Sequence, residues 1–201
     1  MTLGHSFPNI LAAARTGAEW AWTQIYEELA PAVTGYLTAR GAPEPTDLAS
    51  EVFLQIVRDL PSFEGDEPQF RAWAFTIAHR RLLDDSRYRA RRPVEPTPHV
   101  PLAGEACAET AEDEALRELS AQRVRRILAG LSTDQQSVLL LRIIGDLTVQ
   151  QVAGVLGKSP GAVKALQRRA LAMVERELAT EGRTPFGPGD ASTGIWTIAS
   201  T

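Results

Sequence analysis

TVQQVAGVLGKSPGAVKALQRRA, residues 148–170, predicts two short helices joined by a tight turn. The small Ala153 lets the helices cross closely, and Gly157 permits the positive φ that the turn requires. Apolar side chains at helical spacing would pack the two helices together: Val152, Leu156, Val163 and Leu166. This pattern is typical of a helix-turn-helix.

The second of these helices carries side chains suited to a nucleic-acid surface. Lys164, Gln167, Arg168 and Arg169 are hydrogen-bond donors that can reach phosphates and base edges in a major groove. An ordinary hairpin of two helices with a solvated basic face is the simpler interpretation. We favour the helix-turn-helix because the packing pattern, the turn and the donor-rich second helix all agree.

Charge is distributed along the chain in blocks of opposite sign. The 201 residues have a formal net charge of −4, which argues against a protein that coats nucleic acid. Residues 71–92 hold seven arginines and two aspartates, and residues 158–176 hold five basic residues and one glutamate. Between these basic blocks, residues 93–118 hold seven carboxylates and one arginine. The pattern indicates two nucleic-acid-facing modules joined by a segment that DNA would repel.

The cysteine count and the apolar runs limit the class of protein. Cys107 is the only cysteine, which excludes an internal disulfide or a cysteine-rich zinc site, and a redox role for it is not expected. No apolar run approaches the length of a membrane span, and the first residues lack a signal pattern, so we expect a cytoplasmic protein. No phosphate loop, paired-carboxylate site or nucleophile constellation appears, so neither an enzyme nor a cofactor or metal is expected.

Helical periodicity predicts three helical segments before residue 92. The first, residues 9–37, is expected to break or kink at Gly17 and Pro31. The second would have Thr46 or Asp47 as its N-cap and run to about residue 60. The third, over about residues 69–91, carries an apolar stripe made of Phe70, Trp73, Ala74, Ile77, Ala78 and Leu82.

The second half of the sequence predicts a linker, more helices and a tail. Prolines and acidic residues predict an extended linker over residues 93–115. Helix is expected from about residue 112 to a stop at Gly130, and again from a cap at Ser132 or Thr133. Gly and Pro after residue 181 predict a flexible tail. Because no run alternates apolar and polar residues, the predicted fold class is all-α, with two small helical domains.

Aromatic and basic side chains alternate along the third predicted helix and its end. Such a surface can stack on unpaired bases while arginines hold the backbone. Trp73 in register with Phe70 and Ile77 fits a core position at least as well, and the arginines at the end could be a solvated helix end. The side chains concerned are Arg71, Trp73, Phe75, His79, Arg80, Arg81, Arg87 and Tyr88.

The second predicted helix begins with an acidic face. Asp47, Ser50 and Glu51 are three and four residues apart and so share one side of the helix. This polar face beside Phe53 and Leu54 suits a protein partner, although a merely solvated face is the simpler interpretation. The opposite side would pack into the module with Leu48, Val52, Ile56 and Leu60.

The order of these parts resembles the extracytoplasmic-function (ECF) sigma factors, the smallest members of the sigma-70 family of bacterial RNA polymerase. In the first module the similar motifs are D-L-A-S-E-V-F at residues 47–53, F-R-A-W at 70–73, and I-A-H-R at 77–80 with Asp84 and Arg87. In the second module they are LSTDQQSVLLLR at residues 131–142 and G-A-V-K at 161–164, followed by Arg169 and Ala170. The resemblance covers about residues 20–178. It departs at Ser50, where glutamine is usual, and at His79 and Gln136, where arginine is usual.

The resemblance implies an alternative sigma factor that binds core RNA polymerase and directs promoter-specific initiation. Residues 8–92 would form a region 2-like domain that binds the clamp helices of the β′ subunit through Asp47, Ser50, Glu51, Phe53 and Leu54. This domain would also recognise and hold the melted minus-10 strand. The residues implied for that contact are Phe63, Glu64, Gly65, Arg71, Trp73, Thr76, His79, Arg80, Asp84, Arg87 and Tyr88.

Residues 116–181 would form a region 4-like domain that reads the duplex minus-35 element and touches the β flap. The residues implied for the DNA contact are Ser159, Gly161, Ala162, Lys164, Ala165, Gln167, Arg168 and Arg169. The acidic linker would thread the polymerase near the RNA exit path. The resemblance implies no catalytic residue and no cofactor, and it leaves an anti-sigma factor open as a further partner.

Two hypotheses lie outside this resemblance. A stand-alone helix-turn-helix regulator would need a dimerisation surface or ligand pocket, and it would bind a palindromic duplex without polymerase. In the tail, residues 182–201, the apolar group Ile195, Trp196 and Ile198 is a candidate docking or autoregulatory motif, while a dispensable tail is about as well supported. Truncation after Glu181 followed by run-off transcription would decide between the two tail hypotheses.

Overall fold

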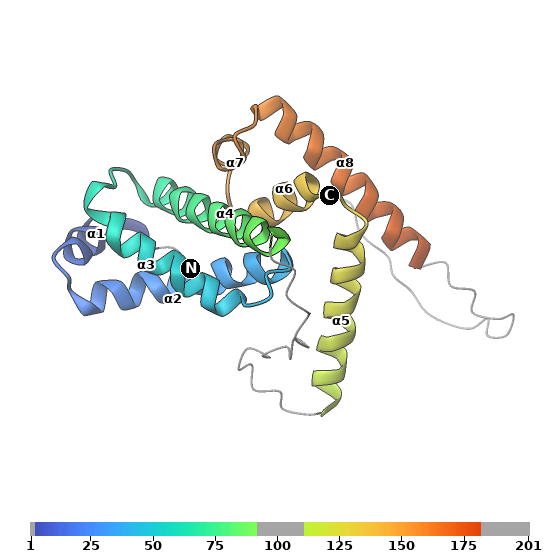
Figure 1. Cartoon of the computed structure of the whole chain (residues 1–201), viewed down its shortest axis with the longest axis horizontal. Helices are drawn as coiled ribbons and strands as arrows, with labels where there is room; N and C mark the ends of the chain where they lie inside the picture. Colours follow the sequence, from blue (N-terminus) through green and yellow to red (C-terminus); the bar gives the residue numbers. More distant parts are fainter. Residues whose placement is uncertain (1–2, 92–110, 182–201) are drawn as a thin grey trace, which may run out of the picture.

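The computed structural model describes residues 3–91 and 111–181. Within these ranges the chain forms helices and turns and no strand, which confirms the all-α class (Figure 1). Two 3-10 helices are present, Gly4–Ser6 and Leu60–Ser62. The α-helices are α1 (Phe7–Arg15), α2 (Glu19–Ala39), α3 (Pro45–Asp59), α4 (Glu67–Arg91), α5 (Ala111–Ala129), α6 (Thr133–Ile143), α7 (Val149–Leu156) and α8 (Pro160–Glu181).

Helices α1 to α4 form the first module, and each turns one apolar side inward. The predicted inward side of α3 is confirmed, since Leu48, Val52, Ile56 and the adjoining Leu60 are all buried. The predicted break at Gly17 is also confirmed: this glycine has a φ of 82° between α1 and α2. The core of the module is completed by Phe7, Ile10, Ile25, Leu29, Val33, Leu37, Phe70, Ala74, Ile77 and Leu82.

Two expectations about helix ends in this module are wrong. Of the break or kink predicted at Pro31, the break is wrong: Pro31 lies inside α2, where Pro31 and Glu27 are both exposed and water can satisfy the Glu27 carbonyl that loses its partner. Neither Thr46 nor Asp47 caps α3. The helix begins at Pro45, whose fixed φ suits the first helical position.

Helices α6 to α8 form the helix-turn-helix, and the predicted cap at Ser132 is confirmed. Ser132 and Thr148 each make a reciprocal capping box, with Gln135 and Gln151 respectively. Gly157 ends α7 with a φ of 62°, as the turn prediction required. Val152 and Val163 are fully buried between the helices, and Leu156 and Leu166 pack against them. The helix-turn-helix is therefore present.

Helix α5 begins at Ala111, close to the predicted start near residue 112, and so overlaps the end of the linker predicted over residues 93–115. Residues 93–110, including Cys107, lie outside the described residues, and so does the tail at 182–201.

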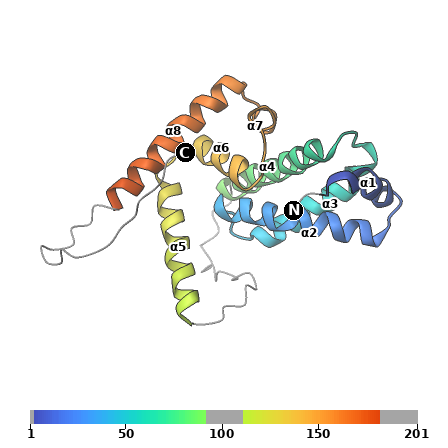
Figure 2. The same cartoon turned by 180° about the vertical axis from the view of Figure 1, so that it is seen from behind.

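The two modules pack directly against each other, which the sequence did not predict. Helix α7 packs across α4, and α6 approaches the C-terminal end of α2 (Figures 1 and 2). One apolar cluster runs without interruption from Phe70 and Ala74 of α4 to Val152 and Val155 of α7. Helix α5 projects away from the first module (Figure 1).

Candidate DNA and polymerase interfaces

The acidic side of α3 faces solvent. Asp47, Ser50 and Glu51 are exposed, and Leu54 beside them is 65% exposed. Phe53 is different: it is buried, and its ring lies 4.8 Å from that of Tyr26 on α2. The structure therefore brings four of the five predicted polymerase-binding side chains to one surface, and it places Phe53 beneath that surface as a support.

An aromatic cluster lies beneath the loop that precedes α4. The ring of Phe63 is 5.0 Å from that of Trp73 and 5.3 Å from that of Phe70, and Phe63 itself is only 8% exposed. Arg15 of α1 donates a hydrogen bond to the Phe63 carbonyl and so ties the loop to the first helix. Phe63 and Trp73 thus belong to the wall of the module, and Trp73 is half-buried in it.

Gly65 in the same loop has no room for a side chain. A Cβ at this position would lie 2.6 Å from Gln69 Oε1 and 2.9 Å from the Phe63 ring. The Gln69 amide is held there by a reciprocal pair with Asp66, in which each side chain accepts from the other's backbone N–H at 2.8 and 2.9 Å. Glu64 and Gly65 consequently form a tight, exposed turn above the aromatic cluster.

The predicted minus-10 residues of α4 have several different surroundings. Arg71 is paired with Glu28 of α2 at 2.8 Å, and both side chains are largely buried. The Thr76 hydroxyl donates to the Ala72 carbonyl of its own helix. Toward the end of α4 the side chains are exposed, and Asp84 pairs with Arg87 at 3.2 Å. The exposed residues of this half of the helix include Arg80, Asp84, Arg87 and Tyr88.

His79 is buried and cannot reach a ligand from its present position. Its Nδ1 lies 2.8 Å from the Tyr36 hydroxyl, and the side chain is 8% exposed. Burial, together with the nearby Arg40 guanidinium, lowers the pKa of His79 to about 4. Asp134 acts in the opposite direction and raises the pKa of His79 by a smaller amount. Burial raises the pKa of Tyr36 to about 12, although Arg40 and Ser137 act in the opposite direction. Both groups are therefore neutral at pH 7.

A polar contact joins the two modules. Arg40 at the end of α2 donates a 2.6 Å hydrogen bond to Gln136 Oε1 on α6. The Gln136 amide nitrogen in turn donates to the carbonyls of Leu128 and Leu131. Arg40 and Gln136 are 96 residues apart in the sequence, so no spacing rule could pair them. The departure from arginine at position 136 was the one available signal.

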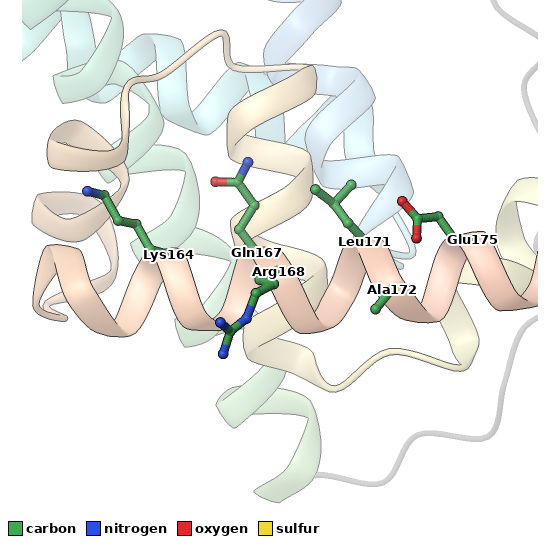
Figure 3. Close-up of a pocket in the computed structure, with 6 residues that line it drawn as sticks. All are labelled: Lys164, Gln167, Arg168, Leu171, Ala172 and Glu175. Carbon is green, nitrogen blue, oxygen red and sulfur yellow. The ribbon is translucent and has the colours of Figure 1, made fainter.

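The N-terminal half of α8 presents the predicted minus-35 residues. Lys164, Gln167 and Arg168 project from one side of the helix, followed by Leu171, Ala172 and Glu175 (Figure 3). Val163 and Ala170 on the other side are fully buried and fix the helix against α6 and α7. The exposed members of the predicted set are Ser159, Gly161, Ala162, Lys164, Arg168 and Arg169, whereas Ala165 and Gln167 are half-buried.

The start of α8 is itself capped. The Ser159 hydroxyl accepts a hydrogen bond from the Ala162 N–H at 3.2 Å. In the described parts of the chain no cluster of His, Cys, Asp or Glu is suited to hold a metal ion. Helices long and apolar enough to cross a membrane are also lacking among the residues described.

Comparisons with known proteins identify both modules. Residues 25–92 match the family model Sigma-70 region 2, and residues 121–174 match Sigma-70, region 4. The ECF RNA polymerase sigma factor BldN of Streptomyces coelicolor is 31% identical over 177 residues, which cover 87% of this chain and 67% of BldN. The ECF RNA polymerase sigma factor SigD of Mycobacterium tuberculosis is 29% identical over 185 residues, which cover 89% of this chain and 87% of SigD.

A solved structure points to the same family. The structure of CnrH in complex with the cytosolic domain of CnrY aligns with a TM-score of 0.63 and 25% identity, and it covers 86% of this chain and 96% of CnrH. In sequence, the RNA polymerase sigma factor CnrH of Cupriavidus metallidurans is 30% identical over 173 residues, which cover 82% of this chain and 90% of CnrH. The chain therefore belongs to the ECF group of the sigma-70 family, the factors that direct bacterial RNA polymerase to promoters.

Proposed function

We propose that the two modules of this sigma factor divide promoter recognition between them. Helix α3 binds core RNA polymerase, α4 and the loop before it hold the melted minus-10 strand, and α8 reads the duplex minus-35 element. Chemistry is left to the polymerase, so the chain itself is not an enzyme and works in the cytoplasm, where the polymerase and the chromosome are.

The observation that carries this proposal is the presentation of Lys164 and Arg168 on α8. Both side chains are exposed at the start of a helix whose opposite side is fully buried, so they stand at fixed positions on a rigid element. A long flexible cation on a rigid helix can contact phosphates, and an arginine can bind the edge of a guanine with two hydrogen bonds. This is the arrangement that a major-groove recognition helix needs.

The minus-10 assignment is supported by the loop at residues 63–66. Its backbone is exposed at Glu64 and Gly65, and the Phe63 and Trp73 rings form an apolar wall directly below. A base that leaves the DNA stack can be received beside such a wall, while the exposed Arg80 can approach the backbone of the strand. His79 would act indirectly, since it supports α4 from inside.

The polymerase assignment is supported by the exposed polar side of α3 together with the exposed Leu54. A mixed surface of two carboxylates and one aliphatic side chain fits a protein partner with basic and apolar groups. The solved complex of CnrH with the cytosolic domain of CnrY suggests one more partner. We propose that an anti-sigma protein also binds this chain, and its test is inhibition of transcription by small proteins encoded beside the gene.

Run-off transcription with purified bacterial core polymerase tests the proposed function. Templates with a randomised upstream region are transcribed with and without the chain, and the 5′ ends of the RNAs are sequenced. We expect start sites that depend on the chain and that share two sequence elements, one near minus 10 and one near minus 35. Binding to a palindromic duplex in the absence of polymerase, without any chain-dependent start site, would favour the stand-alone regulator instead.

A further inference from the structure

The first described residues, 3–15, form a segment that lies outside the region 2 match. That match begins at residue 25, whereas the first 3-10 helix and α1 end at residue 15. Helix α1 lies at the end of the first module where α4 begins (Figures 1 and 2). The segment is therefore a neighbour of the loop at residues 63–66, the proposed holder of the minus-10 strand.

Two polar contacts tie this segment to the two ends of the loop. At the end of α1, the Arg15 guanidinium donates to the Phe63 carbonyl, where the loop starts. Where the loop ends, Glu67 is the first residue of α4, and both of its carboxylate oxygens accept hydrogen bonds from the segment. Oε1 accepts from the Leu3 N–H at 2.8 Å, and Oε2 accepts from the Gly4 N–H at 2.7 Å. Because charged groups make stronger hydrogen bonds than neutral ones, the loop is firmly held at both ends.

An apolar contact joins the same segment to the wall beneath the loop. The ring of Phe7, which is 2% exposed, lies 5.5 Å from the ring of Phe70. The Phe70 ring in turn lies 5.3 Å from that of Phe63 and 5.6 Å from that of Trp73. Aromatic pairs at such separations stabilise beyond the area that they bury, so α1 and the wall support each other.

The Arg15 contact is not needed to cover the apolar side of α1. That side is already covered by the packing of four buried side chains, Phe7, Ile10, Leu11 and Ala14. Arg15 is an exposed residue at the end of the helix, and its guanidinium nevertheless reaches the backbone of the loop. A group that selects a base has to be held in place before the base arrives, since ordering it on binding costs free energy. The two polar contacts supply that order in advance.

We propose that residues 3–15 set how strictly this sigma factor selects a base of the minus-10 strand. Arg15 and Glu67 are positioning residues: they hold the loop at residues 63–66 and do not contact the base. This inference rests on the proposed minus-10 role of the loop. Selection near minus 35 depends on α8, so it should not change with either residue.

Base preference in transcription tests the proposal. Each minus-10 position of the selected promoter is changed to the other three bases, and transcription by the purified holoenzyme is measured. A mismatched base lowers recognition by about 5- to 150-fold. In Arg15→Ala this ratio should fall at least about threefold at one or more minus-10 positions, while the ratios at minus 35 stay unchanged. Arg15→Lys keeps a charged donor for the Phe63 carbonyl, so its ratios should stay within about twofold of the wild type.

Hydrogen exchange of the free chain measures the order of the loop without polymerase or DNA. The Phe63 N–H bonds to the Leu60 carbonyl at 3.1 Å, so it exchanges only when the loop opens. In Arg15→Ala and in Glu67→Ala, a peptide that covers residues 61–70 should exchange at least about threefold faster than in the wild type. Glu67→Ala should also lower the minus-10 ratios, and it decides the matter if Arg15→Ala does not fold.

Trp22→Phe is the matched control. It keeps an aromatic ring but removes the 3.1 Å hydrogen bond that the Trp22 indole donates to the Ala14 carbonyl. The variant therefore loses one contact between α1 and α2 and keeps both contacts with the loop. Exchange of the peptide over residues 61–70 and the minus-10 ratios should match those of the wild type.

The outcomes separate this proposal from the proposed function. Unchanged minus-10 ratios in Arg15→Ala refute it, including the case in which transcription falls equally from all templates, which would indicate a direct contact of Arg15 with phosphate. Unchanged exchange of the loop in both variants refutes it as well. If the wild type shows no base preference near minus 10 while the loop of the variants exchanges faster, the anchoring of the loop stands and its proposed minus-10 role fails.

Discussion

At the scale of single residues, exposure separates the candidate contacts into two groups. Lys164 and Arg168 are exposed on α8, where their periodicity placed them. Phe53 and His79 lie within motifs of the first module but are buried. A motif records which residue types recur at a position. Whether the side chain meets a partner or supports the surface depends on neighbours from other helices, here Tyr26 and Tyr36.

Removal of a cation from α8 should weaken DNA binding and leave polymerase binding intact. Arg168→Ala and Lys164→Ala are each expected to reduce affinity for the selected minus-35 duplex, by about 1–3 kcal/mol where the side chain contacts a base. Fluorescence anisotropy measures the affinity for DNA, and competition with the wild type for core polymerase measures the affinity for polymerase. Arg58→Ala, an exposed change on α3, is the control for loss of one charge. Loss of polymerase affinity with unchanged duplex affinity would contradict the assignment of the second module.

Stability should fall as pH is lowered from about 6.5 toward 4 because of His79. The unfolded chain binds a proton at the ordinary histidine pKa of 6.5, whereas the folded chain does so only near its pKa of about 4. In that window the unfolded state holds more protons, so acid favours unfolding. The groups that face His79 are Tyr36 and Arg40 of the first module and Asp134 of α6.

Urea unfolding at pH 7 and pH 5 measures this effect. Between pH 7 and pH 5 the free energy of unfolding should fall by about 1–2 kcal/mol more in the wild type than in His79→Gln. The glutamine retains a hydrogen-bonding side chain but does not titrate. Carboxyl groups contribute equally to both proteins and cancel in the difference. Equal losses in the two proteins would show that His79 is not held neutral by burial.

At the scale of helices, most of the secondary structure follows from local rules. The cap at Ser132, the left-handed Gly157 and the inward side of α3 all agree with the sequence pattern. The wrong expectations concern Pro31 and the start of α3. Pro31 is tolerated inside α2 because the carbonyl left without a partner can reach water. Helix α3 starts at Pro45 because proline suits the first helical position.

The turn of the helix-turn-helix offers a matched pair of glycine substitutions. Gly157→Ala should destabilise the chain by about 1 kcal/mol, because an L-residue is strained at a φ of 62°. Gly154→Ala, inside α7, meets no neighbouring atom and should stabilise by about 0.5–1 kcal/mol through the better helix propensity of alanine. Thermal unfolding of both variants checks the opposite signs. A stabilising Gly157→Ala would exclude the left-handed turn.

The acidic side of α3 can be removed without loss of the fold. Asp47→Ala with Glu51→Ala should weaken association with core polymerase, while circular dichroism stays near that of the wild type. The only ion pair lost that the described residues show is the exposed 3.6 Å contact of Glu51 with Arg81, and such pairs contribute at most about 1 kcal/mol. Competition with labelled wild type measures binding, and Glu19→Ala with Glu27→Ala on α2 is the control. A double variant that competes normally would rule out the polymerase assignment.

At the scale of the whole molecule, the modules share one core, and we expect them to unfold together. Within the described residues, all tryptophans lie in the first module, so their fluorescence reports its unfolding, whereas circular dichroism reports the helices of both. The two transitions should coincide in the wild type. They should separate in Gln136→Arg, which removes the hydrogen bond that Gln136 accepts from Arg40 of the first module. Two distinct transitions in the wild type would mean that the shared core does not couple the modules.

The sequence by itself determined the helices, the helix-turn-helix and the family. These depend on local periodicity, capping and turn residues, and on motifs that lie within short spans such as residues 47–53 and 161–164. The sequence also placed the exposed candidates Asp47, Lys164 and Arg168 correctly on helix surfaces. Tertiary structure alone decided the burial of Phe53 and His79 and the contact of Arg40 with Gln136. Those features arise between residues far apart in the chain, where packing geometry selects the partner and no spacing rule applies.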